Sequence, residues 1–225
     1  MAAPYSAGVM SLLLSAASKE YPGVKIPSQF LYKVVRESAT EMEGYNHLDQ
    51  GHGYINAVNA LNLLRKYIDQ GEIERFETYT ISSTTPNFPD GRAPNLYLRN
   101  GLFLQKEDTY SFKITRNNFQ KNDKFYRAYR LECDSDWLLP VQKKTYIRND
   151  QPTYVSVKFD LDKMKEPGLY TARITGYRDD RNNFPEFEML AVVVMPYKVC
   201  SEGDYSLSWE SKAVEQGLVD RYFIE

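Results

Sequence analysis

The side chains that could attack a carbonyl are Ser6, Ser11 and Ser15, which share an apolar run near the start of this 225-residue chain. A serine becomes a nucleophile only when a base, most often histidine, takes its proton. The chain has just 2 histidines, His47 and His52, and both lie in a polar stretch well beyond that run. We therefore predict that these serines have no catalytic role and that the chain itself carries no catalytic residue.

The histidines and the clustered aspartates also have plain structural explanations. A metal site needs several converging ligands, and neither a cysteine nor a further histidine lies near His47 and His52. We expect both to be loop histidines, and we expect no metal or other cofactor. Asp134 and Asp136 could form a pair of catalytic carboxylates, but on a turn we expect them to be solvated. The polar run 179–183 is predicted to be a hairpin tip.

Composition and charge exclude several classes of function. The chain has 28 basic and 30 acidic residues, so its net charge of −2 gives no electrostatic signal for nucleic acid or an anionic membrane. No apolar stretch approaches the roughly 20 residues that a membrane span needs. The 2 cysteines, Cys133 and Cys200, show no metal or redox spacing, and we expect both to be reduced. Reduced cysteines favour a cytoplasmic location, with secretion as the alternative.

The first residues carry the most specific signal. Met1, Ala2, Ala3 and Pro4 precede an apolar run, and proline is tolerated in the first turn of a helix. The small residues between 2 and 17 would let such a helix pack closely, as a central buried helix needs. This segment resembles the end of the subtilase nucleophile motif Gly-Thr-Ser-Met-Ala-Ala-Pro. The resemblance implies that the catalytic serine of the complete peptidase would immediately precede Met1.

A second motif follows at the spacing seen in subtilases. Gly51 and Gly53 form a Gly-x-Gly turn that leads into an alanine-rich helix, and glycine permits backbone angles closed to other residues. The segment 48–61 resembles the closing motif of subtilase catalytic domains. Between the two motifs, 26–40 has the pattern of the connecting helix. We expect Met1, Ala2, Ala3, Pro4, Gly51 and Gly53 to support the catalytic site from outside it.

The character of the chain changes after Gly71, a predicted helix C-terminal cap. From there apolar residues alternate with polar ones in short segments separated by turns, a pattern typical of antiparallel strands. We predict an α + β fold: a helical remnant of a subtilisin-like domain over 1–72, an immunoglobulin- or fibronectin-III-like β-sandwich over 73–200, and a linker entering a further β-domain over 201–225. The apolar segment 187–195 should be a central strand buried on both faces.

Short motifs in the second half narrow the resemblance. Residues 95–99, 136–137, 167–171 and 187–196 look like the domain that follows the catalytic domain in the tripeptidyl peptidase II family, and 216–225 is similar to that family's passage into its next β-domain. The resemblance implies a Ser-His-Asp peptidase that releases tripeptides from free N-termini, with its triad outside this chain.

The resemblance also determines the expected partners. They are peptide substrates and the remainder of the same polypeptide. Self-association into a homo-oligomer is left open. We expect the chain to bind neither nucleic acid nor a membrane. The alternative to an inactive peptidase fragment is a non-catalytic β-sandwich module that binds or supports other proteins. In the peptidase fragment the apolar residues of 1–20 would lack the sheet against which they pack in an intact subtilase.

Overall fold

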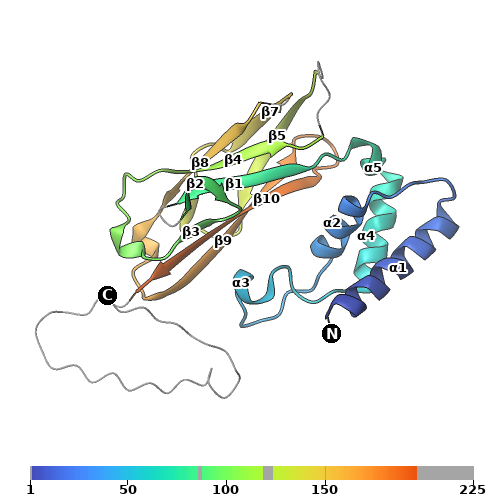
Figure 1. Ribbon diagram of the computed structural model, residues 1–225, viewed down its shortest axis with the longest axis horizontal. Helices are drawn as coiled ribbons and strands as arrows, with labels where there is room; N and C mark the ends of the chain where they lie inside the picture. Colours follow the sequence, from blue (N-terminus) through green and yellow to red (C-terminus); the bar gives the residue numbers. More distant parts are fainter. Residues whose placement is uncertain (1, 86–87, 119–123, 150, 197–225) are drawn as a thin grey trace, which may run out of the picture.

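The computed structural model describes residues 2–85, 88–118, 124–149 and 151–196. Helices come first along the chain and strands follow, and the helices gather at one end of the sheets (Figure 1). This α + β arrangement agrees with the prediction. The predicted segment 201–225 lies outside the described residues. The helices are α1 Ala2–Glu20, α2 Ser28–Glu37, α3 His47–Gln50, α4 Ala57–Asp69 and α5 Glu72–Arg75.

Helix α1 is buried along a single stripe, which differs from the central burial expected of it. Val9, Leu13 and Ala17 recur every four residues and face the other helices, because side chains at that spacing lie on one side of a helix. On the other side Leu12 is 68% and Leu14 is 42% exposed. The described chain therefore covers only one side of this apolar helix.

The helical segment ends slightly later than predicted. Gly71 has φ 68° and follows the end of α4, so its predicted capping conformation is confirmed. The short helix α5 then continues to Arg75, past the expected division at residue 72. Phe76, which follows α5, packs edge-on against Phe30 with ring centroids 5.1 Å apart.

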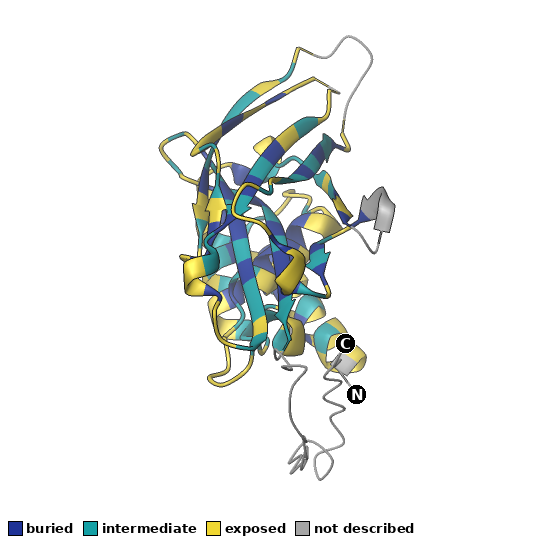
Figure 2. Ribbon diagram, turned by 90° about the vertical axis from the view of Figure 1, so that its left-hand side faces the viewer, coloured by how far each residue is buried: buried dark blue, intermediate teal, exposed yellow. Residues whose placement is uncertain are grey.

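The strands form two five-stranded sheets ordered β2-β1-β4-β8-β6 and β3-β10-β9-β5-β7. Their inward residues share one core that includes Phe112, Val155, Ile174 and Met189, and the outward residues alternate with them (Figure 2). The strands are β1 Tyr79–Thr85, β2 Phe88–Ala93, β3 Leu96–Leu98, β4 Tyr110–Arg116, β5 Tyr126–Cys133, β6 Leu138–Pro140, β7 Lys144–Arg148, β8 Thr153–Phe159, β9 Gly168–Arg178 and β10 Pro185–Met195.

Strand β10 departs from the prediction in two ways. It pairs in parallel with β3, so the sheets are not purely antiparallel. It also lies next to the edge strand β3 rather than at the centre of its sheet. Phe187 and Met189 point into the core of the sandwich, whereas Glu188 contacts His52 at the helical end. One face of β10 is thus buried by the core of the sandwich, and part of its other face is buried by the helical end of the molecule.

Candidate functional site

The two predicted motifs meet in space although about 50 residues separate them. Ala2, Ala3 and Pro4 form the first turn of α1, and Met1 lies outside the described residues. The ring of Tyr5, which follows Pro4, lies 6.0 Å from that of Tyr54, which follows the Gly-x-Gly turn. The turn is therefore a neighbour of the helix N-terminus, where a helix dipole favours negative charge. That these residues support a catalytic site stays a prediction.

The Gly-x-Gly turn requires its second glycine. Gly53 has φ 100°, and a Cβ built on it would lie 2.3 Å from the carbonyl oxygen of Thr40. The close approach exists because Thr40 and Tyr54 exchange two backbone hydrogen bonds of 2.8 Å. Any side chain at residue 53 would break this bridge. Gly51 also has a positive φ, 63°, but its Cβ would meet open space.

The three serines belong to α1. Of the two predicted loop histidines, His47 instead begins α3, and His52 lies in the Gly-x-Gly turn. Ser11 donates its hydroxyl to the carbonyl of Ala7 at 2.9 Å, a local helix contact. His47 Nε2 lies 2.9 Å from Asp134 Oδ2, which resembles half of a catalytic triad. Its other nitrogen, Nδ1, lies 3.4 Å from Arg173 Nη2. A guanidinium is always a donor and offers no proton for a base to remove, so this pair cannot activate a nucleophile in this arrangement.

Asp134 is solvated as expected, with 41% of its side chain exposed, but it also has structural partners. Besides contacting His47, its Oδ1 accepts the backbone N–H of Arg173 at 2.8 Å. Asp136 is the more exposed member of the pair, with 77% of its side chain accessible and an ion pair to Lys163. The two aspartates thus have separate structural roles. Asp134 ties the loop after β5 to both β9 and α3.

His52 is partly buried, as is His47, whose side chain is 18% exposed. The Nε2 of His52 lies 3.4 Å from Glu188 Oε2 on β10, and its side chain is 24% exposed. Burial lowers the pKa of His52; Glu188 opposes this change, while the positive charges of Arg173 and Arg36 add to it. Arg173 also donates to the carbonyl of Gly51 at 3.0 Å. We call His47, His52, Asp134, Arg173 and Glu188 the histidine junction.

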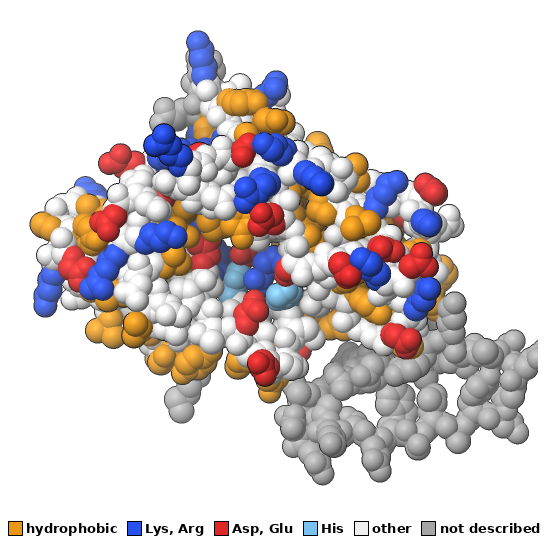
Figure 3. Space-filling model, turned by 180° about the vertical axis from the view of Figure 1, so that it is seen from behind, with side chains coloured by type: hydrophobic (Ala, Val, Ile, Leu, Met, Phe, Trp, Pro, Cys, Tyr) orange, Lys and Arg blue, Asp and Glu red, His pale blue; other side chains and the backbone are white. Residues whose placement is uncertain are grey.

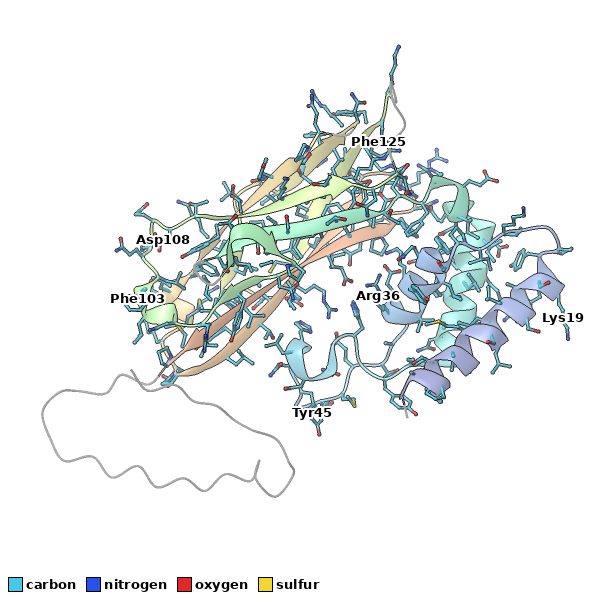
Figure 4. The ribbon with its side chains drawn as sticks, viewed as in Figure 1. Lys19, Arg36, Tyr45, Phe103, Asp108 and Phe125 are labelled. Atoms are coloured by element: carbon cyan, nitrogen blue, oxygen red, sulfur yellow. The ribbon has the colours of Figure 1, made fainter. Side chains whose placement is uncertain are left out.

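The histidine junction borders two cavities along α2. Figure 3 shows both histidines, in pale blue, in a hollow among acidic and basic side chains. One cavity of about 320 Å³ lies between α2 and the sheets, and a second of about 440 Å³ lies between α1, α2 and the Gly-x-Gly turn. Gln29, Arg36 and His52 line both. Figure 4 places Arg36 on the side of α2 that faces the sheets.

A second contact between helices and sheets is buried, and no sequence pattern predicted it. Arg178, at the end of β9, is 2% exposed and binds the fully buried carboxylate of Glu72 on α5. Asn182 donates to the same carboxylate. The hairpin between β9 and β10 confirms the predicted tip at 179–183, but that tip is inserted against the helices. Charge alone cannot reveal such burial from sequence, because charged residues are mostly exposed.

Phe184 completes this buried contact. We call Glu72, Arg178, Asn182 and Phe184 the hairpin junction. The ring of Phe184 is 1% exposed and belongs to the helical core rather than to the sandwich. It lies edge-on to Tyr67, with centroids 4.8 Å apart, and stacks on Phe30 at 6.3 Å. The helical core is therefore closed by a side chain from the sheets.

Next to the hairpin junction, Glu186 is shared by several polar groups. Its side chain is fully buried, and Arg127 Nη1 lies 2.6 Å from its Oε1. The hydroxyl of Tyr129 donates to its other oxygen, and the hydroxyls of Tyr79 and Tyr129 contact each other. Burial raises the pKa of both tyrosines far above the usual tyrosine range, and the negative charge of Glu186 is the second cause. Both hydroxyls therefore remain protonated donors across the physiological range.

The described residues offer little else for cofactor chemistry. Within them, no three His, Cys, Asp or Glu side chains gather in a way that could hold a metal ion. Burial raises the pKa of the Cys133 thiol, which keeps it in the less reactive protonated form. Cys200 lies outside the described part of the chain. Among the helices of that part, none combines the length and apolar character of a membrane span.

Comparison with known proteins agrees with the predicted resemblance. Pyrolysin from Pyrococcus furiosus, a subtilase, is 28% identical to this chain over an alignment of 226 residues, which covers 93% of this chain and 15% of pyrolysin. A crystal structure of tripeptidyl peptidase 2 (TPP II) matches with a TM-score of 0.68 and 20% identity, covering 88% of this chain and 16% of that one. No family model matches the chain.

These similarities confirm the predicted likeness to subtilases and to TPP II. At 20% identity the second match shows the fold alone. Both cover nearly all of this chain, so helices and sheets occur together in the same order in larger proteins. The chain spans about a sixth of each relative's length. It is therefore similar to a segment of subtilisin-like peptidases.

Proposed function

We propose that this chain is the last part of a subtilisin-like catalytic domain joined to the β-domain that follows it, and that it is inactive alone. The observation that carries the proposal is helix α1. It has no charged residue before Lys19, yet one side of it is exposed. A helix that is apolar all round belongs in an interior. The parallel sheet of a subtilisin-like domain would cover the side that includes Leu12 and Leu14.

The position of the motif residues supports the same proposal. Ala3 and Pro4 are exposed in the first turn of α1, where the subtilase motif would place the nucleophilic serine directly before Met1. The Gly-x-Gly turn beside Tyr54 lies against this start. In the full protein an upstream histidine would act as base and an upstream aspartate would orient it. The helix N-terminus would then favour the negative charge of the attacked carbonyl.

The proposed substrates are peptides with a free N-terminus, from which tripeptides are released. Support comes from the TPP II-like fold and from the short motifs of the second half. We also propose that the sheets form an immunoglobulin- or fibronectin-III-like sandwich that braces the catalytic domain through its two junctions, and that the protein is cytoplasmic.

The test extends the reading frame upstream of Met1. We expect in-frame Gly-Thr-Ser before Met1, and we expect the extended protein to release tripeptides from a fluorogenic peptide with a free amino group. Its matched control replaces the serine before Met1 by alanine and should lose both activity and fluorophosphonate labelling. The 225-residue chain should be inactive and unlabelled. Labelling of this chain at any serine, or a stop codon directly upstream, would refute the proposal.

A further inference from the structure

Both histidines of this chain lie at the same contact between helices and sheets. The proposed peptidase activity uses neither of them. His47 comes from α3 and His52 from the Gly-x-Gly turn, while their partners Asp134, Arg173 and Glu188 come from the sheet side. Histidine is the side chain whose charge ordinarily changes near neutral pH. The histidine junction is thus the part of the described interface most open to control by protons.

The two histidines face unequal surroundings. His47 contacts one carboxylate, Asp134, and one guanidinium, Arg173. His52 contacts the carboxylate of Glu188, but that carboxylate also lies 3.9 Å from Arg173 Nε. Arg36 on α2 lines the same cavities as His52 from the other side. A proton on His52 would make it a second cation, beside Arg173, at the carboxylate of Glu188.

We propose that the histidine junction is a proton-sensitive contact, in which charging His52 loosens the Gly-x-Gly turn from strands β9 and β10. The hairpin junction would hold during this change, because none of its four residues is a histidine. Loosening would therefore be local to the turn and α3. In the larger protein this would couple the position of the closing motif to pH.

The sign of the pH dependence follows from the lowered pKa of His52. A histidine with a folded-state pKa below its ordinary value of 6.5 binds a proton more weakly in the folded state than in the unfolded state. Its contribution to stability is complete above pH 6.5 and is lost as the pH falls below that value. A displacement of one pKa unit changes the opening equilibrium about tenfold. Acid should therefore open the contact.

The experiment follows the ring signals of the histidines by NMR titration, assigned with His47→Gln and His52→Gln. We expect the signal of His52 to titrate below that of a free histidine. Arg36→Gln should raise its pKa and Glu188→Gln should lower it further. Lys106→Gln, which removes the same charge from an exposed loop, should leave it unchanged. These opposite shifts need no variant in which His52 itself is changed.

Urea unfolding at about pH 8 and about pH 5.5 measures the consequence. The unfolding equilibrium constant of the unmodified chain should rise severalfold at the lower pH relative to that of His52→Gln. An unshifted His52 signal, or the same pH dependence in His52→Gln, would overturn the inference. So would a dependence that His47→Gln alone removes. Because each readout is a property of this chain, failure here leaves the proposed peptidase function untouched.

Discussion

The helical end and the sheets bury their apolar residues in different ways. The two sheets supply both sides of their own core, and their outward residues are polar or only partly buried. The helices close a core only along one stripe of α1 and take Phe184 from the sheets to complete it. The difference shows that the sheets supply their own core, whereas the described helices leave one side of α1 uncovered. It also shows that the two parts share a buried core residue and are not joined by the continuous chain alone.

The largest expected effect comes from removing the shared aromatic ring. Phe184→Ala should lower the free energy of unfolding by about 4 kcal/mol, because a buried phenylalanine leaves both its transfer free energy and a cavity behind. Phe103→Ala is the matched control, since Phe103 is 76% exposed and should tolerate the change. Urea unfolding followed by far-ultraviolet circular dichroism measures both. If the two variants are equally stable, the hairpin does not close the helical core.

A somewhat smaller loss is expected when the buried ion pair is broken. Glu72→Gln removes one of the three carboxylates around the guanidinium of Arg178, leaving Asp180 and Glu186, and should destabilise the protein by about 2 kcal/mol. Glu132→Gln serves as the control, because its pair with Arg130 is exposed and such pairs contribute little. Thermal unfolding of the two variants compares them directly. A loss for Glu72→Gln no greater than that of the control would mean that the hairpin junction adds no stability.

The smallest expected effect concerns the exposed side of α1. Leu12→Lys should change the stability of this chain by less than about 0.5 kcal/mol, since the side chain has no cover here. It should also reduce self-association, because it places a charge on an apolar surface. In the extended peptidase the same substitution should prevent folding, which enzyme activity and solubility would report. A large loss of stability in this chain would show that α1 is already covered.

Several features could be predicted from local pattern alone. The alternation in residues such as Phe112 and Ile114 led to the strands, because every second side chain of a strand faces the core. Gly71 was recognised as a cap and 179–183 as a hairpin tip, because these depend on local backbone conformation. The division of the chain into helices and strands and its resemblance to subtilases also came from residue type and order.

Contacts between distant segments could not be predicted in this way. Glu72 and Arg178 are ordinary charged residues in the sequence, and only the packing of the hairpin against α5 removes both from water. Asp134 is exposed as expected, but only the approach of α3 places it in contact with His47. The parallel pairing of β10 with β3 joins two segments that are far apart in the chain, and such pairing leaves no periodic signal in the sequence.

The sequence by itself thus determined which segments become helices or strands, and which family of peptidases they resemble, because periodicity and motif order are properties of neighbouring residues. The tertiary structure alone decided that Phe184 belongs to the helical core and that both histidines meet the sheets. The physical reason is that burial and electrostatic environment are sums over residues far apart in the chain. A side chain acquires them only when the fold brings those residues together.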